Sequence, residues 1–411
     1  MAHAGESSIE RLLPELLAEI HGRLESFVDR LAFASACGAP SRRLMRPEAP
    51  CLLLPGSTPE RVLLQSLSES ADARAPDPAM RDYVILGSSS AGWVVTGEQA
   101  DLPAVTTIPS VRRLYSGGWF CLALAPFAEA RFDRGRHNTT TAGGGECWKG
   151  TFTHTAAHMR LYFYRKVVLS VIPGGGPGRR SYAAMLLLRR RFSAPAFATS
   201  EDPAWRVAPS RDGVEDAIFH QDGAFYSVTY SCDVEAWGRD VETGAFVSRA
   251  VAPRLAFDER NLCRKYLAAA PDGRLMAVLK YSEEEQVQVP FGGYQQSGTF
   301  TRVSFMVQVL DAARGRWEKT TDIGDLALFV GVNGTTCVSA REWAGWVYFT
   351  DDDVGEACLR DVRHSQDRYG SIPGEAWGVG VYNLQTGVAE RIIAQEDCPR
   401  WPPPAWFTPS V

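Results

Sequence analysis

The sequence predicts a mainly β fold, a β-propeller of six to seven blades preceded by a small N-terminal helical piece. Two different sequence patterns support this prediction. Residues 12–37 carry apolar side chains at intervals of three and four, which is typical of helices. The remaining chain has aromatic and β-branched runs of about five to eight residues, separated by Gly, Pro, Asp and Asn, which is typical of short strands.

The helical piece reads LLPELLAEIHGRLESFVDRLAFASAC over residues 12–37. Pro14 suits a first helical position, and Asp29 is expected to cap a second helix that ends near Gly38. Each helix has about ten residues, below the ~12–15 needed for marginal stability in isolation. The apolar face must therefore be covered by a partner or by the propeller.

Repeated turns indicate the blades. The segments AWGRDVETGAFVS, VQVLDAARGRWEKT and GVYNLQTGVAERI each end a strand at Asp or Asn and reach a glycine four residues later. These glycines, Gly244, Gly315 and Gly387, are 71 and 72 residues apart. A second set, Gly223, Gly273 and Gly345, precedes strands at spacings of 50 and 72 residues. Such sheet-sized periods are typical of propellers.

Chain length sets the expected blade number. About 360 residues at roughly 45–50 per blade predict seven blades, or six if the loops are long. No helical period separates successive strands, which disfavours a parallel α/β sheet. Polar, Gly/Pro-rich segments such as YSEEEQVQVPFGGYQQSG are expected to be inserted loops on the blade faces, where partners bind.

Composition excludes several classes of function. The 411 residues have a net charge of -5, so no global basic field exists for nucleic acid or anionic lipid. No apolar run reaches the ~18 residues of a membrane span, and the N-terminus lacks a signal-peptide pattern. Nine cysteines without a C-x-x-C motif favour reduced thiols and a cytoplasmic or nuclear location.

Sequence motifs for metal binding, phosphate binding or catalysis are weak in this chain. His154 and His158 have zinc-ligand spacing but no glutamate between them and no evident third ligand. The loop GGGPGRRS does not fit a phosphate-binding motif, and the run Asp351–Asp353 is interpreted as a strand-ending turn. We expect no catalytic residue, no metal and no cofactor. A propeller hydrolase is a third hypothesis, after the two protein-binding functions given below, and it would need acidic side chains that converge in the central channel.

The C-terminal segment RWPPPAWF holds two tryptophans on either side of three prolines. Two interpretations are open. The tail closes the propeller by packing its aromatic side chains on the first blade, or it is exposed and binds a WW- or SH3-type domain.

These segments resemble a known family. The N-terminal helical piece resembles an F-box, in which a Leu-Pro pair opens a helix and an Asp-containing second helix ends in a cysteine. The later segments are similar to the plant F-box-associated, KIB-type β-propeller. The matching stretches are LGSSSAGWVVTG at 86–97, EDAIFHQDGAFYSVTY at 215–230, GRWEKTTDIGDLALFVGVNGTTCVSA at 315–340, WVYFTDDD at 346–353, GVGVYNLQTG at 378–387 and WPPPAWFTPS at 401–410.

The resemblance implies two domains, an F-box-like helical domain at 8–47 and a KIB-type propeller at 48–411. It also implies a substrate-recognition subunit of an SCF-type ubiquitin ligase. The F-box would dock a Skp-type adaptor on a cullin scaffold, and the propeller would bind a target protein. The expected adaptor-binding residues are Leu13, Pro14, Leu17, Ile20, Leu24 and Leu31.

The F-box-like domain is degenerate at its C-terminal end. An F-box usually closes with a tryptophan-arginine pair, whereas this chain has GAPSRR at 38–43. The alternative function is therefore a stand-alone propeller that binds proteins, with helices that no longer bind an adaptor and only cover the propeller.

Overall fold

The computed structural model describes most of the chain in discontinuous stretches. The described residues are 12–37, 41, 44–45, 48–55, 61–67, 70–74, 83–88, 93–98, 110–113, 120–123, 131–133, 151–153, 164–170, 182–188, 194–199, 201–202, 205–210, 212–260, 262–291, 294–331, 334–340, 343–350, 379–392 and 404–408.

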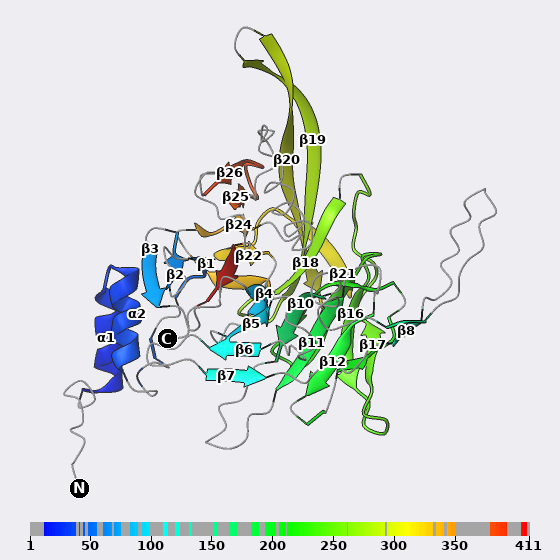
Figure 1. Cartoon of the computed structure of the whole chain (residues 1–411), viewed down its shortest axis with the longest axis horizontal. Helices are drawn as coiled ribbons and strands as arrows, with labels where there is room; N and C mark the ends of the chain where they lie inside the picture. The colour runs from blue at the N-terminus through cyan, green and yellow to red at the C-terminus, as the bar shows by residue number, and fades with distance from the viewer. Residues whose placement is uncertain are drawn as a thin grey trace.

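Antiparallel sheets dominate the structure (Figure 1). Four sheets have four strands that follow chain order. They are β4 (Tyr83–Ser88), β5 (Trp93–Glu98), β6 (Ser110–Arg113) and β7 (Phe120–Ala123); β10 (Tyr164–Leu169), β11 (Ala183–Leu188), β12 (Ala196–Thr199) and β13 (Arg206–Val207); β14 (Val214–Phe219), β15 (Phe225–Thr229), β16 (Val234–Arg239) and β17 (Phe246–Ala250); and β18 (Leu262–Ala269), β19 (Leu275–Phe291), β20 (Tyr294–Asp311) and β21 (Arg316–Thr320).

A fifth four-stranded sheet joins the two ends of the chain. Its order is β27 (Ala405–Phe407), β1 (Cys51–Pro55), β2 (Arg61–Gln65) and β3 (Ser70–Arg74). A further sheet has five strands in the order β23 (Thr336–Ser339), β22 (Leu326–Val330), β24 (Trp346–Phe349), β25 (Gly380–Asn383) and β26 (Ala389–Arg391). The strands β8 (Arg131–Asp133) and β9 (Thr151–Thr153) form a separate pair.

The arrangement is a β-propeller, as the sequence predicts. The first strands of successive sheets contact one another, β27 with β4, β4 with β10, β10 with β14 and β14 with β18. The expected six to seven blades are not confirmed, because the described residues form five blades on the regular four-strand plan. The β22–β26 sheet departs from that plan through a parallel pairing of β22 with β24.

The C-terminal strand closes the ring. Cys51 pairs with Phe407 and Leu53 with Ala405, so β27 extends the first sheet by one strand. The indole Nε1 of Trp406 donates a hydrogen bond to the carbonyl oxygen of Val330 at 3.1 Å, on the neighbouring sheet. Among the described residues, the tail therefore closes the propeller, the first of the two predicted interpretations.

Aromatic packing reinforces this closure. The ring centroids of Trp406 and Phe329 are 5.0 Å apart in an edge-to-face arrangement, and Phe329 stacks on Tyr348 with centroids 4.6 Å apart. Leu52 and Leu54 of β1 belong to the same buried cluster. One core thus joins the first strand of the propeller to β27 and to the β22–β26 sheet.

The predicted repeat turns are confirmed. Gly244, Gly315 and Gly387 adopt φ values of 67°, 62° and 70°, a backbone conformation that glycine adopts without a steric cost. At each turn a side-chain oxygen four residues earlier accepts backbone N–H bonds; Asp240 Oδ1, for example, accepts from Thr243 N at 2.8 Å. The Thr243 hydroxyl and backbone N–H both donate to Asp240 and lower the pKa of that carboxyl, and the backbone N–H of Arg314 lowers the pKa of the Asp311 carboxyl.

One predicted loop is wrong. The segment YSEEEQVQVPFGGYQQSG, expected as an inserted loop, continues the strands β19 and β20 as a long antiparallel hairpin. The register is unbroken from Met276, paired with Val309, to Phe291, paired with Tyr294. Alternation in QVQVPF and the Gly-Gly pair that follows it in the sequence are a local strand-turn signal, which the polarity of the segment obscured.

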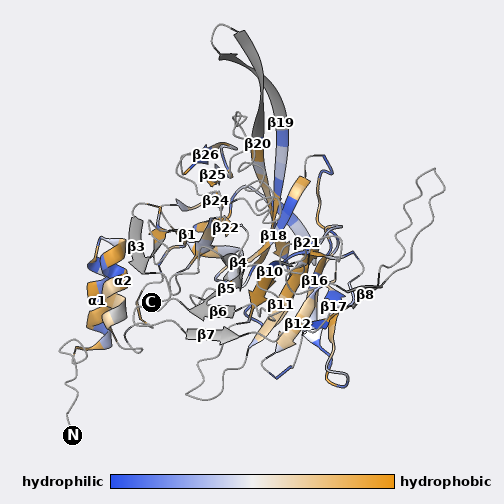
Figure 2. Ribbon diagram, in the orientation of Figure 1, coloured by the Kyte–Doolittle hydropathy of each residue, from blue (hydrophilic) through white to orange (hydrophobic). Residues whose placement is uncertain are grey.

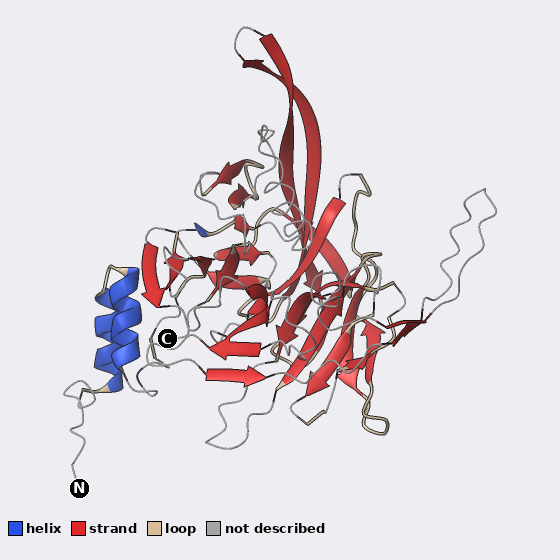
Figure 3. Ribbon diagram, viewed as in Figure 1, coloured by secondary structure: helices blue, strands red, loops and turns tan. Residues whose placement is uncertain are grey.

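Two helices of ten residues each precede the sheets, α1 (Pro14–Arg23) and α2 (Phe27–Ala36) (Figure 3). Pro14 begins α1 as predicted. The predicted cap of α2 is wrong: Ser26 is the N-cap and its Oγ accepts from Asp29 N at 3.4 Å, so Asp29 lies in the first turn. In the described part of the chain, neither helix is long and apolar enough to cross a membrane.

Trp406 provides a direct test of the closure. We expect Trp406→Ala to lower the free energy of unfolding by about 3–5 kcal/mol, because it opens a cavity between two sheets. Trp406→Phe keeps most of the apolar contact and removes one of two donors to the Val330 carbonyl, which still accepts from Thr350 N, so it should cost only about 0.5–1.5 kcal/mol. Urea unfolding curves measure both. A Trp406→Ala effect no larger than that of the exposed Val241→Ala control would contradict this role.

Candidate functional site

The α1–α2 pair presents an apolar surface to solvent. Leu13, Leu16 and Ile20 lie on one face of α1 with exposed fractions of 64%, 51% and 39%. Leu12 and Val28 are also exposed, and apolar colour covers parts of both helices in Figure 2. Elsewhere in the described residues, exposed large apolar side chains are scattered valines and Leu44. We call Leu12, Leu13, Leu16, Ile20 and Val28 the helical apolar face.

The side of the helices next to the helical apolar face is packed. Leu17, Ala34, Cys37 and Met45 form a small buried cluster, in which Leu17 is only 2% exposed. At 3.6 residues per turn, the inner row Leu17–His21 lies next to the outer row Leu13–Leu16–Ile20 around α1, turned from it by about a quarter of a circle. The inner row holds the two helices together and leaves the outer row uncovered by any described residue.

An ion pair anchors the helices to the chain that enters the propeller. The guanidinium of Arg30 donates to both carboxylate oxygens of Glu48, with Nε–Oε1 at 2.8 Å and Nη2–Oε2 at 3.0 Å. Its third nitrogen donates to the backbone carbonyls of Leu24 and Glu25 at 3.1 and 2.6 Å. Glu48 is buried and lies three residues before β1. The bidentate geometry fixes the orientation of α2, which lies beside β3.

A buried histidine lies beneath the helical apolar face. His21 is 1% exposed, and its Nε2 lies 3.6 Å from Glu48 Oε1. Burial lowers the pKa of His21, with the Arg30 charge acting in the same direction and Glu48 opposing it. Neither ring nitrogen has a hydrogen-bond partner among the described residues. Protonation of this ring would therefore place a charge in a site built for the neutral form.

The predicted adaptor-binding residues fall into three groups. Leu13 and Ile20 are exposed, Leu17 is buried, and Pro14, Leu24 and Leu31 are half-buried. The structure brings Leu16 into the exposed row, and the sequence reasoning omitted this residue from the site. The same i, i+3, i+4 spacing that selected Leu13 and Ile20 could have identified it.

A second candidate site lies on the first strands of three adjacent sheets. Lys166 of β10 pairs with Asp216 of β14, with Nζ–Oδ1 at 2.5 Å. Lys265 of β18 pairs with Glu215 of β14. All four side chains are buried. Charges therefore alternate in sign across the three strands and hold them to one another.

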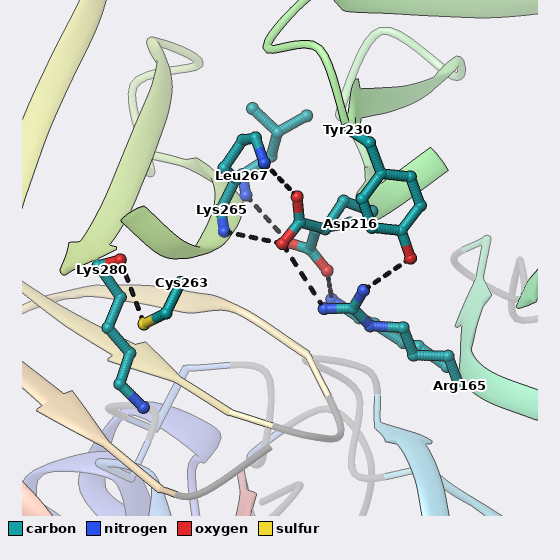
Figure 4. Close-up of polar contacts among 9 residues, drawn as sticks. Arg165, Asp216, Tyr230, Cys263, Lys265, Leu267 and Lys280 are labelled. Carbon is teal, nitrogen blue, oxygen red and sulfur yellow. Dashed lines mark hydrogen bonds and ion pairs between the residues drawn. The ribbon is translucent and has the colours of Figure 1, made fainter. Parts of the chain in front are cut away.

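We call Lys166, Glu215, Asp216 and Lys265 the charged ladder. Further hydrogen bonds hold its carboxylates in place (Figure 4). Leu267 N donates to Asp216 Oδ2 at 2.9 Å, and Lys265 N donates to Glu215 Oε1 at 3.3 Å. Arg165 donates to the Tyr230 hydroxyl at 3.0 Å. Buried carboxylates are stable only when paired and hydrogen-bonded, and both carboxylates meet this condition. The ladder is consequently a device for blade alignment rather than an open ligand site.

Register irregularities explain how adjacent charged residues enter the ladder together. Pairing shifts between Tyr164 and Lys166 in β10, and between Val214 and Asp216 in β14. A bulge places two residues opposite one, so Arg165–Lys166 and Glu215–Asp216 do not simply alternate between faces. Sequence reasoning missed this set. Its signal is the complementary RK and ED pairs, 50 residues apart.

Several sequence motifs lie outside the described residues. These are His154 and His158, the GGGPGRRS loop and the Asp351–Asp353 run. Among the residues that the structure describes, no cluster of three or more His, Cys, Asp or Glu side chains could hold a metal ion.

The closed ring of sheets and the helical pair define a β-propeller protein with an N-terminal helical extension. The family model of the KIB1-4 β-propeller matches residues 64–383, more than three quarters of the chain. The chain belongs to the KIB1-4 β-propeller family. This membership confirms the KIB-type propeller that the sequence resemblance predicts, and the match does not include the helices.

No curated protein matched the sequence. A crystal structure described as a "putative 6-phosphogluconolactonase" from Bacteroides uniformis is similar with a TM-score of 0.32 and 10% identity, over 84% of this chain and 95% of that chain. A likeness of this size supports no statement about activity.

The charged ladder predicts strong coupling between its members. Lys166→Met should cost about 3–5 kcal/mol of unfolding free energy, because it leaves the Asp216 carboxylate buried and unpaired. Adding Asp216→Asn should recover more than half of this loss, since Asn still accepts from Leu267 N. Urea unfolding of the single and double variants measures the coupling. Additive effects would contradict it. Arg274→Met, at an exposed ion pair with Asp272, is the control and should cost under about 1 kcal/mol.

His21 makes the helical pair sensitive to acid. Its pKa is lowered in the folded state, so below its ordinary value of 6.5 the opened helices bind a proton that the folded pair does not. The free energy that the neutral His21 ring contributes to folding of the helical pair is therefore fully present above pH 6.5. It is lost as the pH falls through the folded-state pKa of His21. Amide protection factors in α1 and α2, measured at about pH 7.5 and about pH 5.5, should decrease with acid.

The His21→Leu variant is the matched comparison for this prediction. It should lose most of the pH dependence of protection in α1, whereas His220→Gln, in the turn before β15, should retain it. The same pH dependence in His21→Leu as in the unaltered chain would show that another group is responsible.

Proposed function

We propose that this chain is the substrate-recognition subunit of an SCF-type ubiquitin ligase. In this proposal the α1–α2 pair docks a Skp-type adaptor on a cullin scaffold, and the propeller binds the target protein. Membership of the KIB1-4 family suggests a protein-interaction module. The proposed location is the cytoplasm, the nucleus or both.

The observation that carries the adaptor half of the proposal is the helical apolar face. Leu13, Leu16 and Ile20 form one exposed row on a helix whose inner side is already packed. Contiguous exposed apolar side chains are typical of protein-binding sites. If the helices served only to cover the propeller, their most apolar row would be expected to face inward.

The anchoring of the helices supports the same proposal. The Arg30–Glu48 ion pair and the buried cluster around Leu17 hold α1 and α2 in one orientation beside the first sheet. A receptor acts by proximity, since it raises the effective concentration of target lysines near the transferred ubiquitin. An adaptor-binding element held in a defined orientation serves that purpose. No bond-making step is assigned to this chain.

The alternative function is a stand-alone protein-binding propeller whose helices only stabilise it. The packing of Leu17 and the burial of Glu48 favour this alternative to the extent that both tie the helices to the rest of the chain. It predicts that a partner still binds after deletion of residues 1–45, and that the deletion lowers stability. The adaptor measurement below separates the two functions.

The test is the affinity of the purified full chain for a recombinant Skp-type adaptor. Leu13→Asp with Leu16→Asp should weaken binding by at least about 100-fold, since central apolar contacts each cost about 1–2 kcal/mol or more when lost. Both side chains are exposed, so the substitutions leave the inner cluster intact. Leu17→Asp is unsuitable because Leu17 is buried and its substitution would disrupt the helices.

Val241→Asp with Val388→Asp is the matched control, because both valines are exposed on propeller turns away from the helices. This control should bind the adaptor as the unaltered chain does. Failure of the unaltered chain to bind the adaptor would contradict the proposed function and favour the stand-alone propeller.

A further inference from the structure

The β19–β20 hairpin extends well beyond the sheet to which it belongs (Figure 1). β19 and β20 have 17 and 18 residues, whereas their outer neighbours β18 and β21 have 8 and 5. Pairing with β18 ends at Tyr281, and pairing with β21 ends at Val307. Beyond these residues the two strands pair only with each other among the described strands. We call Ser282–Val303 the arm.

The arm leaves two strand edges open. Each strand of an antiparallel pair directs half of its backbone N–H and C=O groups towards its neighbour and half away from it. Along Ser282–Phe291 of β19 and Tyr294–Met306 of β20, no described strand accepts the outward groups. An edge of this length is a template for an added strand.

The edge of β19 is more suitable for a partner strand than its length alone indicates. Its pairing with β20 is continuous from Ser282 to Phe291 without a register shift. Pro290 lacks an N–H group, so the uninterrupted stretch of β19 is Ser282–Val289. An extended segment of about eight residues would match this stretch.

The negative charge of the arm indicates which kind of segment would bind along its edge. The sequence places Glu283, Glu284 and Glu285 in succession on β19, and Arg302, which pairs with Glu283, is the only basic residue of the arm. A second copy of this chain would offer this edge no opposite charge: an in-register parallel pairing sets glutamate beside glutamate, and an antiparallel pairing over Ser282–Val289 sets the three glutamates opposite Gln288, Val287 and Gln286. A basic segment would instead meet opposite charge, and the acidic run would increase its association rate.

We propose that the β19 edge of the arm, from Ser282 to Val289, binds an extended basic segment of the target protein as an added β-strand. The unpaired strand edge supplies backbone hydrogen bonds, and the three glutamates supply selectivity for positive charge. This inference rests on the target-binding half of the proposed function and does not depend on adaptor docking. Its failure and that of adaptor docking are therefore distinguishable.

The test is the selection of a randomised eight-residue displayed peptide library on the full chain. Enriched peptides should carry net positive charge and lack proline. The variant Glu283→Lys/Glu284→Lys/Glu285→Lys should weaken binding of an enriched, fluorescein-labelled peptide by about tenfold or more. The control Glu201→Lys/Glu242→Lys/Glu390→Lys changes the net charge equally at exposed positions on other strands and turns. It should change the affinity by less than about twofold.

Peptide chemistry tests strand addition without altering the protein. N-methylation of every second amide of the enriched peptide removes the donors on one edge, so one of the two alternate methylation patterns should abolish binding and the other should retain it. The variant Glu283→Lys/Glu284→Lys/Glu285→Lys should keep its affinity for the Skp-type adaptor if the proposed function holds.

Three results would overturn the proposal. They are a selection that enriches no peptide, enriched peptides without net positive charge, and binding that survives both methylation patterns or the charge reversal of the arm.

Discussion

The pairing of β27 with β1 is the interaction on which the rest of the structure depends. A propeller is a ring, and each sheet is supported by its neighbours on both sides, so an open ring would leave two apolar sheet faces in water. Three residues of β27 join the ends of a chain more than 350 residues apart in sequence. Trp406 crosses to the next sheet through its hydrogen bond to Val330 and its contact with Phe329. Closure is thus both a backbone and a packing interaction.

The charged ladder has a different role from closure. Apolar packing between sheets tolerates small displacements, whereas the Lys166–Asp216 and Lys265–Glu215 pairs require the first strands of three sheets to align in one register. The bulges at Arg165 and Glu215 enable this alignment. A ring aligned from within can support elements that project from it, namely the α1–α2 pair at one side and the arm at another (Figure 1).

Much of this organisation could be predicted from the sequence because it is local. Turns from Asp240 to Gly244 and from Asn383 to Gly387 depend on one side-chain acceptor and one glycine, and both are visible in the sequence. The predicted six to seven blades differ from the five regular ones because the parallel pairing of β22 with β24 joins segments that no local pattern connects. The ladder was missed for the same reason, since its partners lie 50 residues apart. Leu17 was assigned to the adaptor surface because periodicity finds a face without showing which side is covered.

The central claim is that the helical apolar face, and not the propeller, contacts the adaptor. Hydrogen exchange of the full chain with and without a Skp-type adaptor tests it most directly. The account predicts that the adaptor slows exchange in Pro14–Arg23 and Phe27–Ala36, while exchange in β27 and in the arm is unchanged. Adaptor-induced protection confined to the propeller strands, or no protection in α1 and α2, would contradict it.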